Sequence, residues 1–317
     1  MASTAGFRPR SRPISILILG DLMLDVVLAP DRTLATGTDV SGRVRLRQGG
    51  SAANTARWAA RLGARTILVS AVGRDLIGRA LVEAVAGDGV TVRAARVAGL
   101  ASGRIGVVVA PGGERSFVAD RGAADALAPD HLRAAWFRRI DAFHLPAYSL
   151  LSPSLAAAAR AGLGHARAAG ATISLDLASS LPLLSQGRRA ARGLVAEVRP
   201  DILFATAAEA EALLGRYALD DLLDFAPIAV VKRGARGALV LAAEGTERIK
   251  FEVATSHVRT AESTGAGDAF DAGFLVAWLG ARARGRSLPE ALHRATLAGH
   301  RAAARHLVGP RPEIVLG

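Results

Sequence analysis

The chain has 317 residues, half of them hydrophobic, and it contains no cysteine. This length and composition suit one large α/β domain, or two ordinary ones, with a sizeable core. The lack of cysteine excludes disulfides, thiolate metal sites and cysteine nucleophiles, and a cytoplasmic location fits it.

Neither a membrane span nor a secretion signal is expected. The signal-like stretch at residues 14–28 is interrupted by Asp21 and Asp25, and no small-residue cleavage site follows it. No apolar run approaches the ~20 residues that a membrane helix needs. We therefore predict no membrane partner.

The formal net charge of +12 raises the question of a nucleic-acid partner. Nearly all the cations are arginines, since Lys232 and Lys250 are the only lysines, and they are spread along the chain. The short basic clusters lie at residues 7–13 and 282–286, and aromatic residues make up only 4% of the sequence, which leaves little for base stacking. We predict no nucleic-acid partner.

Short β-branched runs alternate with longer Ala- and Leu-rich periods. The pattern predicts strands at residues 14–20, 66–72, 141–145, 171–176, 201–205, 228–232 and 238–242. It predicts helices at residues 52–62, 76–86, 155–169 and 288–305, and another over the apolar run 269–279. This alternation favours a mainly parallel central sheet with helices on both faces, with ligands at the carboxyl ends of the strands.

Two features of the N-terminal half suit a polar ligand. Asp25, at the end of the first predicted strand, could accept hydrogen bonds from sugar hydroxyls, or it could begin a turn. Gly49 and Gly50 open a helix and allow close backbone approach, so that Asn54 points from the first turn toward a ligand. The alternative for this junction is a plain helix start capped by Ser51.

Two features of the C-terminal half suit a nucleotide. Glu209 stands at a helix start, where it could reach a hydrated Mg²⁺ or simply favour the helix dipole. Lys232, Gly234 and Gly237 lie in a connection between two strands, where a cation and glycines suit phosphates. A charged hairpin is the alternative for this connection.

The most informative segment is residues 263–268. Gly265, Ala266 and Gly267 precede a helix, and unpaired N–H groups at a helix start form an anion site. Asp268 cannot itself bind that anion, so it stands where it could take a proton from a nucleophile attacking a bound phosphate. A tight turn with an acid favouring the dipole is the alternative. The seven histidines lack ligand spacing, so we assign no histidine metal site.

Residues 33–46 and 103–119 break the alternation with short extended pieces and Gly/Pro turns, and residues 111–113 are typical of a hairpin turn. They could be separate surface hairpins or could pair as a small sheet over the strand ends. We favour the small sheet, because a lid would exclude water from phosphoryl transfer.

Four motifs together resemble the PfkB/ribokinase family of carbohydrate kinases over almost the whole chain. They are residues 20–25, residues 49–56 with 62–64, residues 71–75 with Gly78, and residues 263–270 with 273–274. The resemblance implies a ribokinase-like α/β fold with a small β-sheet lid, formed by residues 14–317 after a flexible tail at residues 1–13. It also implies ATP-dependent transfer of the γ-phosphate to a hydroxyl of a sugar or sugar-like substrate, with Mg²⁺ as cofactor, and a possible homodimer through the lid.

Site residues follow from the same resemblance. Asp268 would be the base, with an anion hole from the N–H groups of Gly265, Ala266 and Gly267. The sugar would be held by Asp25, Gly49, Gly50 and Asn54. The nucleotide and its metal would lie against Lys232, Gly234, Gly237 and Glu209.

Two positions depart from the family pattern. Thr206 stands where Asn commonly opens an Asn-x-x-Glu motif, and Glu262-Ser263 replaces Asp-Thr before the last signature, so a monovalent cation is possible but not expected. The alternatives are a nucleoside kinase and a non-catalytic sugar- or nucleotide-binding protein on the same fold. A Rossmann dehydrogenase is not supported, because no Gly-x-Gly-x-x-Gly follows the first strand.

Overall fold

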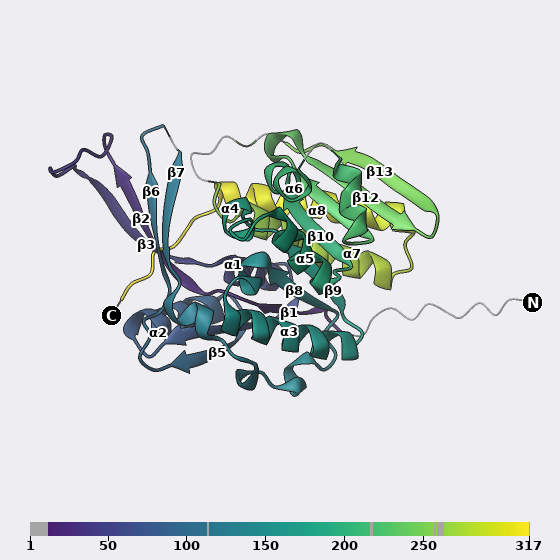
Figure 1. Cartoon of the computed structure of the whole chain (residues 1–317), viewed down its shortest axis with the longest axis horizontal. Coiled ribbons are helices and arrows are strands. Elements are labelled where there is room, and N and C mark those ends of the chain that lie inside the picture. Colours follow the sequence, from purple (N-terminus) through teal and green to yellow (C-terminus); the bar gives the residue numbers. More distant parts are fainter. Residues whose placement is uncertain (1–11, 113, 216–217, 257, 259–262, 317) are drawn as a thin grey trace, which may run out of the picture.

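A computed structural model describes residues 12–112, 114–215, 218–256, 258 and 263–316 (Figure 1). Within them, nine strands form the main sheet, which is parallel from β5 to β11 and antiparallel at β12 and β13. In spatial order the strands are β13 (Glu247–Val253), β12 (Ala238–Glu244), β11 (Ile228–Lys232), β10 (Ile202–Thr206), β9 (Thr172–Asp176), β8 (Ala142–Pro146), β1 (Ser15–Leu19), β4 (Arg65–Gly73) and β5 (Thr91–Val97).

Helices cover both faces of this sheet. Side chains alternate along each strand, so Ile16 and Ile18 enter one core while Leu17 and Leu19 enter the other. The first core is closed by α1 (Ser51–Arg61), α2 (Leu76–Gly87), α7 (Ala266–Ala283) and α8 (Leu288–Val308). The second is closed by α3 (Pro153–Ala168), α4 (Ser180–Leu183), α5 (Arg188–Val198) and α6 (Ala207–Leu214).

Short 3₁₀ turns occupy several connections between these elements. They are η1 (Gly122–Ala126), η2 (Pro129–His131), η3 (Ala134–Phe137), η4 (Ala147–Leu150), η5 (Leu219–Asp224) and η6 (Gly234–Arg236). No helix in the described ranges combines the length and the apolar character that crossing a membrane requires.

Four further strands form a small sheet that projects from one side of the body in Figure 1. Its order is β3 (Gly42–Gly49), β2 (Met23–Pro30), β6 (Arg104–Val109) and β7 (Arg115–Asp120), with β2 and β6 parallel and the outer pairs antiparallel. The C-terminal segment lies along β3, because the N–H of Ile314 donates to the carbonyl of Leu46 at 2.8 Å and Glu313 lies 3.5 Å from Arg45.

Close packing of α7 against α8 sets the position of the helix that begins at the Gly-rich turn. A Cβ on Gly273 would lie 2.7 Å from the carbonyl oxygen of Ala298, and one on Gly299 would lie 2.9 Å from the ring of Phe270. The two glycines therefore let the helices approach more closely than any larger residue would allow. The start of α7 is fixed by this contact.

The predicted fold class is confirmed: the structure has a mainly parallel sheet covered on both faces, together with a small separate sheet. At most strand ends, the predicted and the observed boundaries differ by no more than one or two residues. Strands β2, β5 and β13 and helices α4 and α5 are absent from the prediction. Of the segment 33–46, only the part from residue 42 onward is a strand, and Gly113 of the predicted turn at residues 111–113 lies outside the described residues.

The placement of Asp25 at the end of the first strand is wrong. Strand β1 ends at Leu19, and Gly20 and Asp21 carry the chain into the small sheet, where Asp25 lies within β2. Of the predicted N-terminal tail, residues 1–11 lie outside the described residues. Arg12 contacts the body through an ion pair with Asp141 at 2.8 Å.

Candidate active site

Asp268 lies in the first turn of α7, and two side chains of α1 bind its carboxylate. The hydroxyl of Ser51 donates to Oδ1 at 2.6 Å, and Nδ2 of Asn54 donates to Oδ2 at 2.9 Å. The alternative in which Ser51 caps its own helix is wrong, because Gly50 is the N-cap residue and makes no side-chain cap. The predicted helix start and the predicted Asn54 junction therefore meet at one carboxylate.

The surroundings of Asp268 favour its neutral form. Burial raises its pKa to about 7, although the hydrogen bonds from Ser51 and Asn54 oppose that shift. A carboxylate with this pKa is ionised in part at neutral pH and can both accept and return a proton. These properties suit a general base.

Of the three residues predicted to precede the helix only Gly265 does so, because α7 begins at Ala266. Gly265 is the N-cap of α7 with φ 84°, in the left-handed region that favours glycine. The N–H of Ala266 donates to the carbonyl of Ser263 at 3.1 Å, so this member of the predicted anion hole is engaged within the turn. A Cβ on Gly267 would lie 3.3 Å from Nζ of Lys232, which places an ammonium group next to the helix start.

Lys232 ends β11 and is held by two carboxylates. Its Nζ lies 3.1 Å from Asp176, at the end of β9, and 3.1 Å from Asp271, in the second turn of α7. Burial disfavours the charged amine, but the charges of Asp176 and Asp271 outweigh burial and raise the pKa of Lys232. Burial and the charge of Asp176 raise the pKa of Asp271 well above its usual value. Sequence reasoning missed both acids, since Asp271 lies inside an apolar helical run.

A cavity of about 540 Å³ opens beside this helix start. Gly234 and Gly237, with φ 59° and 82°, form its edge after β11, as the predicted connection requires. Its other walls come from the α6 and α7 starts and from α8, and they include Thr206, Lys232, Ala266, Gly267 and His300.

Glu209 is bound to the start of its own helix. The N–H of Thr206 donates to the Glu209 carboxylate at 2.7 Å, and the N–H of Glu209 donates to the Thr206 hydroxyl at 3.3 Å. This reciprocal capping box explains why Thr is accepted at position 206. Burial and the charge of Asp176 raise the pKa of Glu209. Among the described residues, no group of three or more His, Asp or Glu side chains forms a ready metal cage.

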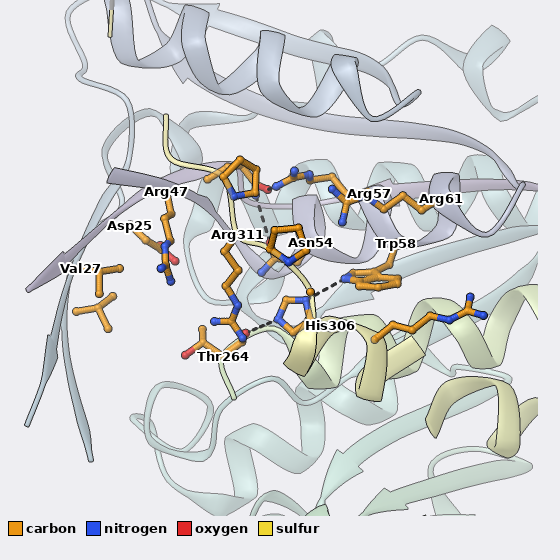
Figure 2. A pocket seen from close by; sticks show the side chains of 16 residues that line it. Asp25, Val27, Arg47, Asn54, Arg57, Trp58, Arg61, Thr264, His306 and Arg311 are labelled. Atoms are coloured by element: carbon orange, nitrogen blue, oxygen red, sulfur yellow. Dashed lines mark hydrogen bonds between the residues drawn. The ribbon is translucent and has the colours of Figure 1, made fainter. Parts of the chain in front are cut away.

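A second cavity, of about 500 Å³, opens beside the same turn, at Thr264 (Figure 2). Asp25, Gln48 and Asn54 line it, together with Thr264 and His306. Gly49 and Gly50 follow Gln48 in the chain but are not among the residues that line this cavity, and neither position has room for a side chain. A Cβ on Gly49 would collide with the Asp25 carboxylate, and one on Gly50 would lie 2.6 Å from the carbonyl oxygen of Asp21.

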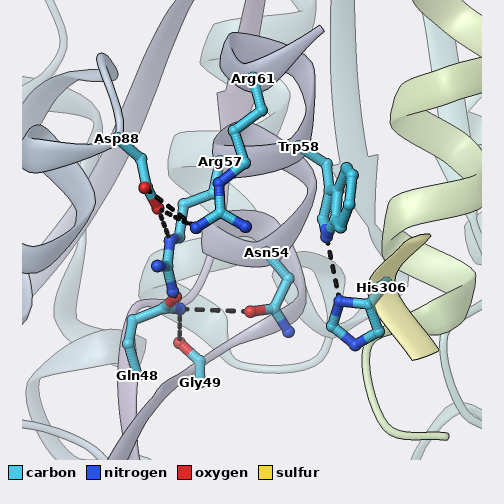
Figure 3. Close-up of polar contacts among 8 residues, drawn as sticks. All are labelled: Gln48, Gly49, Asn54, Arg57, Trp58, Arg61, Asp88 and His306. Carbon is cyan, nitrogen blue, oxygen red and sulfur yellow. Dashed lines mark hydrogen bonds and ion pairs between the residues drawn. The ribbon is translucent and has the colours of Figure 1, made fainter. Parts of the chain in front are cut away.

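Hydrogen bonds connect α1 with β3 and with α8, and connect α8 with the turn before α7 (Figure 3). Gln48 Nε2 donates to the carbonyl of Gly49 at 2.6 Å and to Oδ1 of Asn54 at 3.3 Å. The indole of Trp58 donates to Nδ1 of His306, whose Nε2 lies 2.7 Å from the carbonyl oxygen of Thr264. Sequence reasoning missed the two contacts of His306 because they join segments far apart in the chain.

Two arginines of the small-sheet region reach toward the site. Arg115, on β7, donates to the hydroxyl of Thr264. Arg121 lies 3.4 Å from Asp21, which is buried at the end of β1 and accepts the N–H of Ala52 at 3.1 Å. Asp21, not Asp25, is therefore the acid at the carboxyl end of the first strand.

Two cavities flank the start of α7, since Thr264 lines one of them and Ala266 and Gly267 line the other. Two ligand sites side by side at the carboxyl ends of parallel strands are the arrangement expected of a phosphoryl-transfer enzyme. A family model described as pfkB family carbohydrate kinase matches residues 14–313. The chain belongs to this family and is a carbohydrate kinase.

Individual relatives agree with this assignment. The chain is 30% identical over 273 residues to the ATP-dependent ribose-1-phosphate kinase of Halopiger xanaduensis, which covers 84% of this chain and 85% of that protein. The fold is similar to the crystal structure of adenosine kinase from Sinorhizobium meliloti, with a TM-score of 0.80, 24% identity and coverage of 96% and 98%. It is also similar to a putative ribokinase II from E. coli in complex with ATP and Mg²⁺, with a TM-score of 0.76, 23% identity and coverage of 94% of each chain.

Proposed function

We propose that this kinase transfers the γ-phosphate of ATP to a hydroxyl group of a sugar or nucleoside. The observation that carries the proposal is the position of Asp268, whose carboxylate is bound by Ser51 and Asn54 at a helix start between two cavities. The names of the relatives from Halopiger and Sinorhizobium support a sugar or nucleoside acceptor.

In the proposed reaction Asp268 is the base. As the acceptor oxygen forms its bond to the γ-phosphorus, the bond from that phosphorus to the bridging oxygen breaks, and ADP leaves. The hydroxyl proton passes to the Asp268 carboxylate. The raised pKa of Asp268 suits this step, because a base works best when its pKa lies near the working pH.

The N–H groups of Gly265, Ala266 and Gly267 are proposed to stabilise the charge on the moving phosphoryl group. Since the Ala266 N–H donates to Ser263 in this structure, it would share or exchange that acceptor on phosphate binding. Lys232 adds a positive charge beside Gly267, and Asp176 and Asp271 hold it in place.

We propose that Gly234 and Gly237 border the nucleotide, and that Asp25, Gly49, Gly50 and Asn54 form the acceptor wall. Gly234 and Gly237 have left-handed backbone conformations that favour glycine, and without side chains they let the backbone approach phosphates closely. This edge of the cavity therefore suits a nucleotide. The small sheet would act as a lid over the acceptor, in one kinase domain spanning residues 14–317.

Glu209 would hold Mg²⁺ through water when ATP is bound, since Mg²⁺ sites in kinases often use only one or two carboxylates. The ion would neutralise charge on the transferred group. The position of Glu209 next to Asp176 and Lys232 fits such a water-mediated contact. A monovalent-cation role for residues 262–263 stays a prediction, and Glu262 lies outside the described residues.

The homodimer and the cytoplasmic location also stay predictions. Val44 and Val118 of the small sheet are 64% and 73% exposed, which gives a dimer an apolar surface to cover. Light scattering coupled to size exclusion would test the dimer directly.

The decisive experiment compares Asp268→Asn with the native protein. We expect the variant to bind ATP with unchanged affinity and to lose about 10²- to 10⁴-fold in kcat, the usual contribution of a general base. Asp220→Asn is the matched control, because Asp220 pairs with Lys250 at the exposed surface. Native-like turnover by Asp268→Asn would contradict the mechanism, and ligand binding without turnover by the native protein would favour the binding-protein alternative.

A further inference from the structure

The wall of the acceptor cavity carries far more positive than negative charge. Its lining includes five arginines, and Asp25 is the one carboxylate among the residues that line it. The arginines come from β3, from α1, from α8 and from the C-terminal segment: they are Arg47, Arg57, Arg61, Arg305 and Arg311. A neutral sugar would need no such wall.

Two of these arginines form ion pairs with a carboxylate that is not among the lining residues. Asp88, which follows α2, accepts from Arg57 and lies 3.0 Å from Arg61 (Figure 3). Arg57 also donates to Gln48. These two side chains therefore form a fixed back wall, while Arg47, Arg305 and Arg311 bring further charge from three different elements.

The small sheet carries further positive charge next to this cavity. Arg43, Arg45 and Arg47 alternate along β3, so they share one face of the sheet. With Arg115 of β7 they line a neighbouring hollow of about 280 Å³ that has no carboxylate among its lining residues. Arg47 borders both this hollow and the acceptor cavity, so the basic surface is continuous from one to the other.

The same cavity reaches the reacting group. Asn54 lines it and donates to Asp268, and Thr264 lines it directly before Gly265. In Figure 2 the side chain of Arg311 is directed toward Thr264, and Arg47 lies beside Asp25, its partner in strand register. A ligand filling the cavity would thus have one end at Asn54 and Thr264, beside the proposed base, and another among the arginines.

Like charges that converge on one cavity repel one another, and a bound anion removes that repulsion. The planar guanidinium group also binds phosphate and carboxylate through paired hydrogen bonds. We propose that the acceptor of this kinase carries an anionic group, a phosphate or a carboxylate, in addition to the hydroxyl that is phosphorylated. This inference rests on the proposed function, since it assigns the second cavity to the acceptor.

The test compares related acceptors with and without an anionic group. Ribose and fructose are assayed against their monophosphates, and glucose against gluconate, at fixed ATP and Mg²⁺. We expect kcat/KM to be at least about tenfold higher for the charged member of the preferred pair, because hydrogen bonds to charged groups are worth that much. The phosphate and carboxylate arms identify which anion is preferred.

Arginine variants test whether the preference for a charged acceptor depends on these side chains. Arg305→Gln and Arg311→Gln should each raise KM for the charged acceptor about tenfold and leave kcat within about twofold. Arg294→Gln, on the same helix as Arg305 and paired with Glu290 at the surface, is the matched control and should change neither. High salt should weaken binding of the charged acceptor only.

Equal or better use of the neutral acceptors would overturn the inference and leave the proposed function intact. If no compound is phosphorylated, the proposed function fails, and calorimetric titration of the same compounds decides the inference separately. Binding of a sugar phosphate or sugar acid that Arg305→Gln or Arg311→Gln weakens would support it. No binding, or binding that neither variant changes, would overturn it.

Discussion

The indole N–H of Trp58 donates to Nδ1 of His306 at 3.0 Å, and this contact fixes the role of the imidazole. Because Nδ1 accepts, the ring proton lies on Nε2, which donates to the carbonyl of Thr264 at 2.7 Å. A Cβ on Gly265 would lie 3.0 Å from the same ring. His306 therefore holds the turn that leads into α7.

We predict that His306 is a positioning residue. His306→Ala should lower kcat about tenfold, with KM for ATP changed by less than about twofold, because a shifted turn misplaces donors in the transition state. Trp58→Phe, which removes only the N–H donor, should have a smaller effect in the same direction. His293→Gln, at an exposed position of α8, is the control. An increase in KM with unchanged kcat would contradict the assignment.

The pKa of Asp268 predicts the acid limb of the rate profile. Its carboxylate must be ionised to act as base, and burial raises its pKa to about 7. We expect kcat/KM to fall about tenfold for each pH unit below this value. Steady-state kinetics from pH 5 to pH 9 would show this limb, and a flat profile down to pH 5 would contradict it.

The same shift affects stability. Since the folded pKa of Asp268 is raised above its usual value, the folded state holds this proton more tightly than the unfolded state does. Its contribution to stability is therefore present at low pH and is lost as the pH rises through about 7. Denaturant titrations should show a smaller loss between pH 5 and pH 8 in Asp268→Asn than in the native protein.

Replacing each of the two lysines of the chain should lower the free energy of unfolding by very different amounts. Lys232→Met leaves Asp176 and Asp271 buried without their cation, so we expect a loss of about 3–5 kcal/mol in unfolding free energy at pH 7. Lys250→Met removes an exposed pair with Asp220 and should cost about 0–1 kcal/mol. The Lys232 penalty should shrink at pH 5, because protonation of Asp271, whose pKa burial already raises, costs less free energy there. Equal penalties for both lysines would contradict the prediction.

Replacing Glu209 should change metal dependence without unfolding α6. Glu209→Gln keeps a residue that can complete the capping box with Thr206. We expect the Mg²⁺ concentration for half-maximal activity to rise about tenfold, with activity recovered at high Mg²⁺. Glu211→Gln, on the same helix, is the control. An unchanged Mg²⁺ dependence would remove Glu209 from the metal site.

The sequence predicts the central parallel strands well because they are buried runs of β-branched residues between turn signals. Edge strands β5 and β13 contain charged residues, such as Arg93 and Lys250, and so lack that signal. Strand β2 is hidden because residues 14–28 form one apolar stretch, in which only Gly20 and Asp21 mark the passage between sheets.

The site residues also include some whose position the local sequence predicts and others whose position it does not. Local rules place Gly265 and Asp268 at a helix start, since glycine conformation and helix polarity are encoded within a few residues. The partners Ser51, Asn54 and His306 come from α1 and α8, and only the packed fold brings them together. Such contacts leave no periodic trace in a single sequence.

The hydrogen bond from Ile314 to Leu46 has a practical consequence for anyone preparing this enzyme. It fastens the last described residues to an edge strand whose neighbours line the acceptor cavity, and Arg311 lies only three positions earlier. An affinity tag fused after the C-terminus would pull on this attachment and distort measured acceptor preferences. In Figure 1 the N-terminal end of the described chain enters on the opposite side of the molecule, so a tag placed there leaves substrate profiling undisturbed.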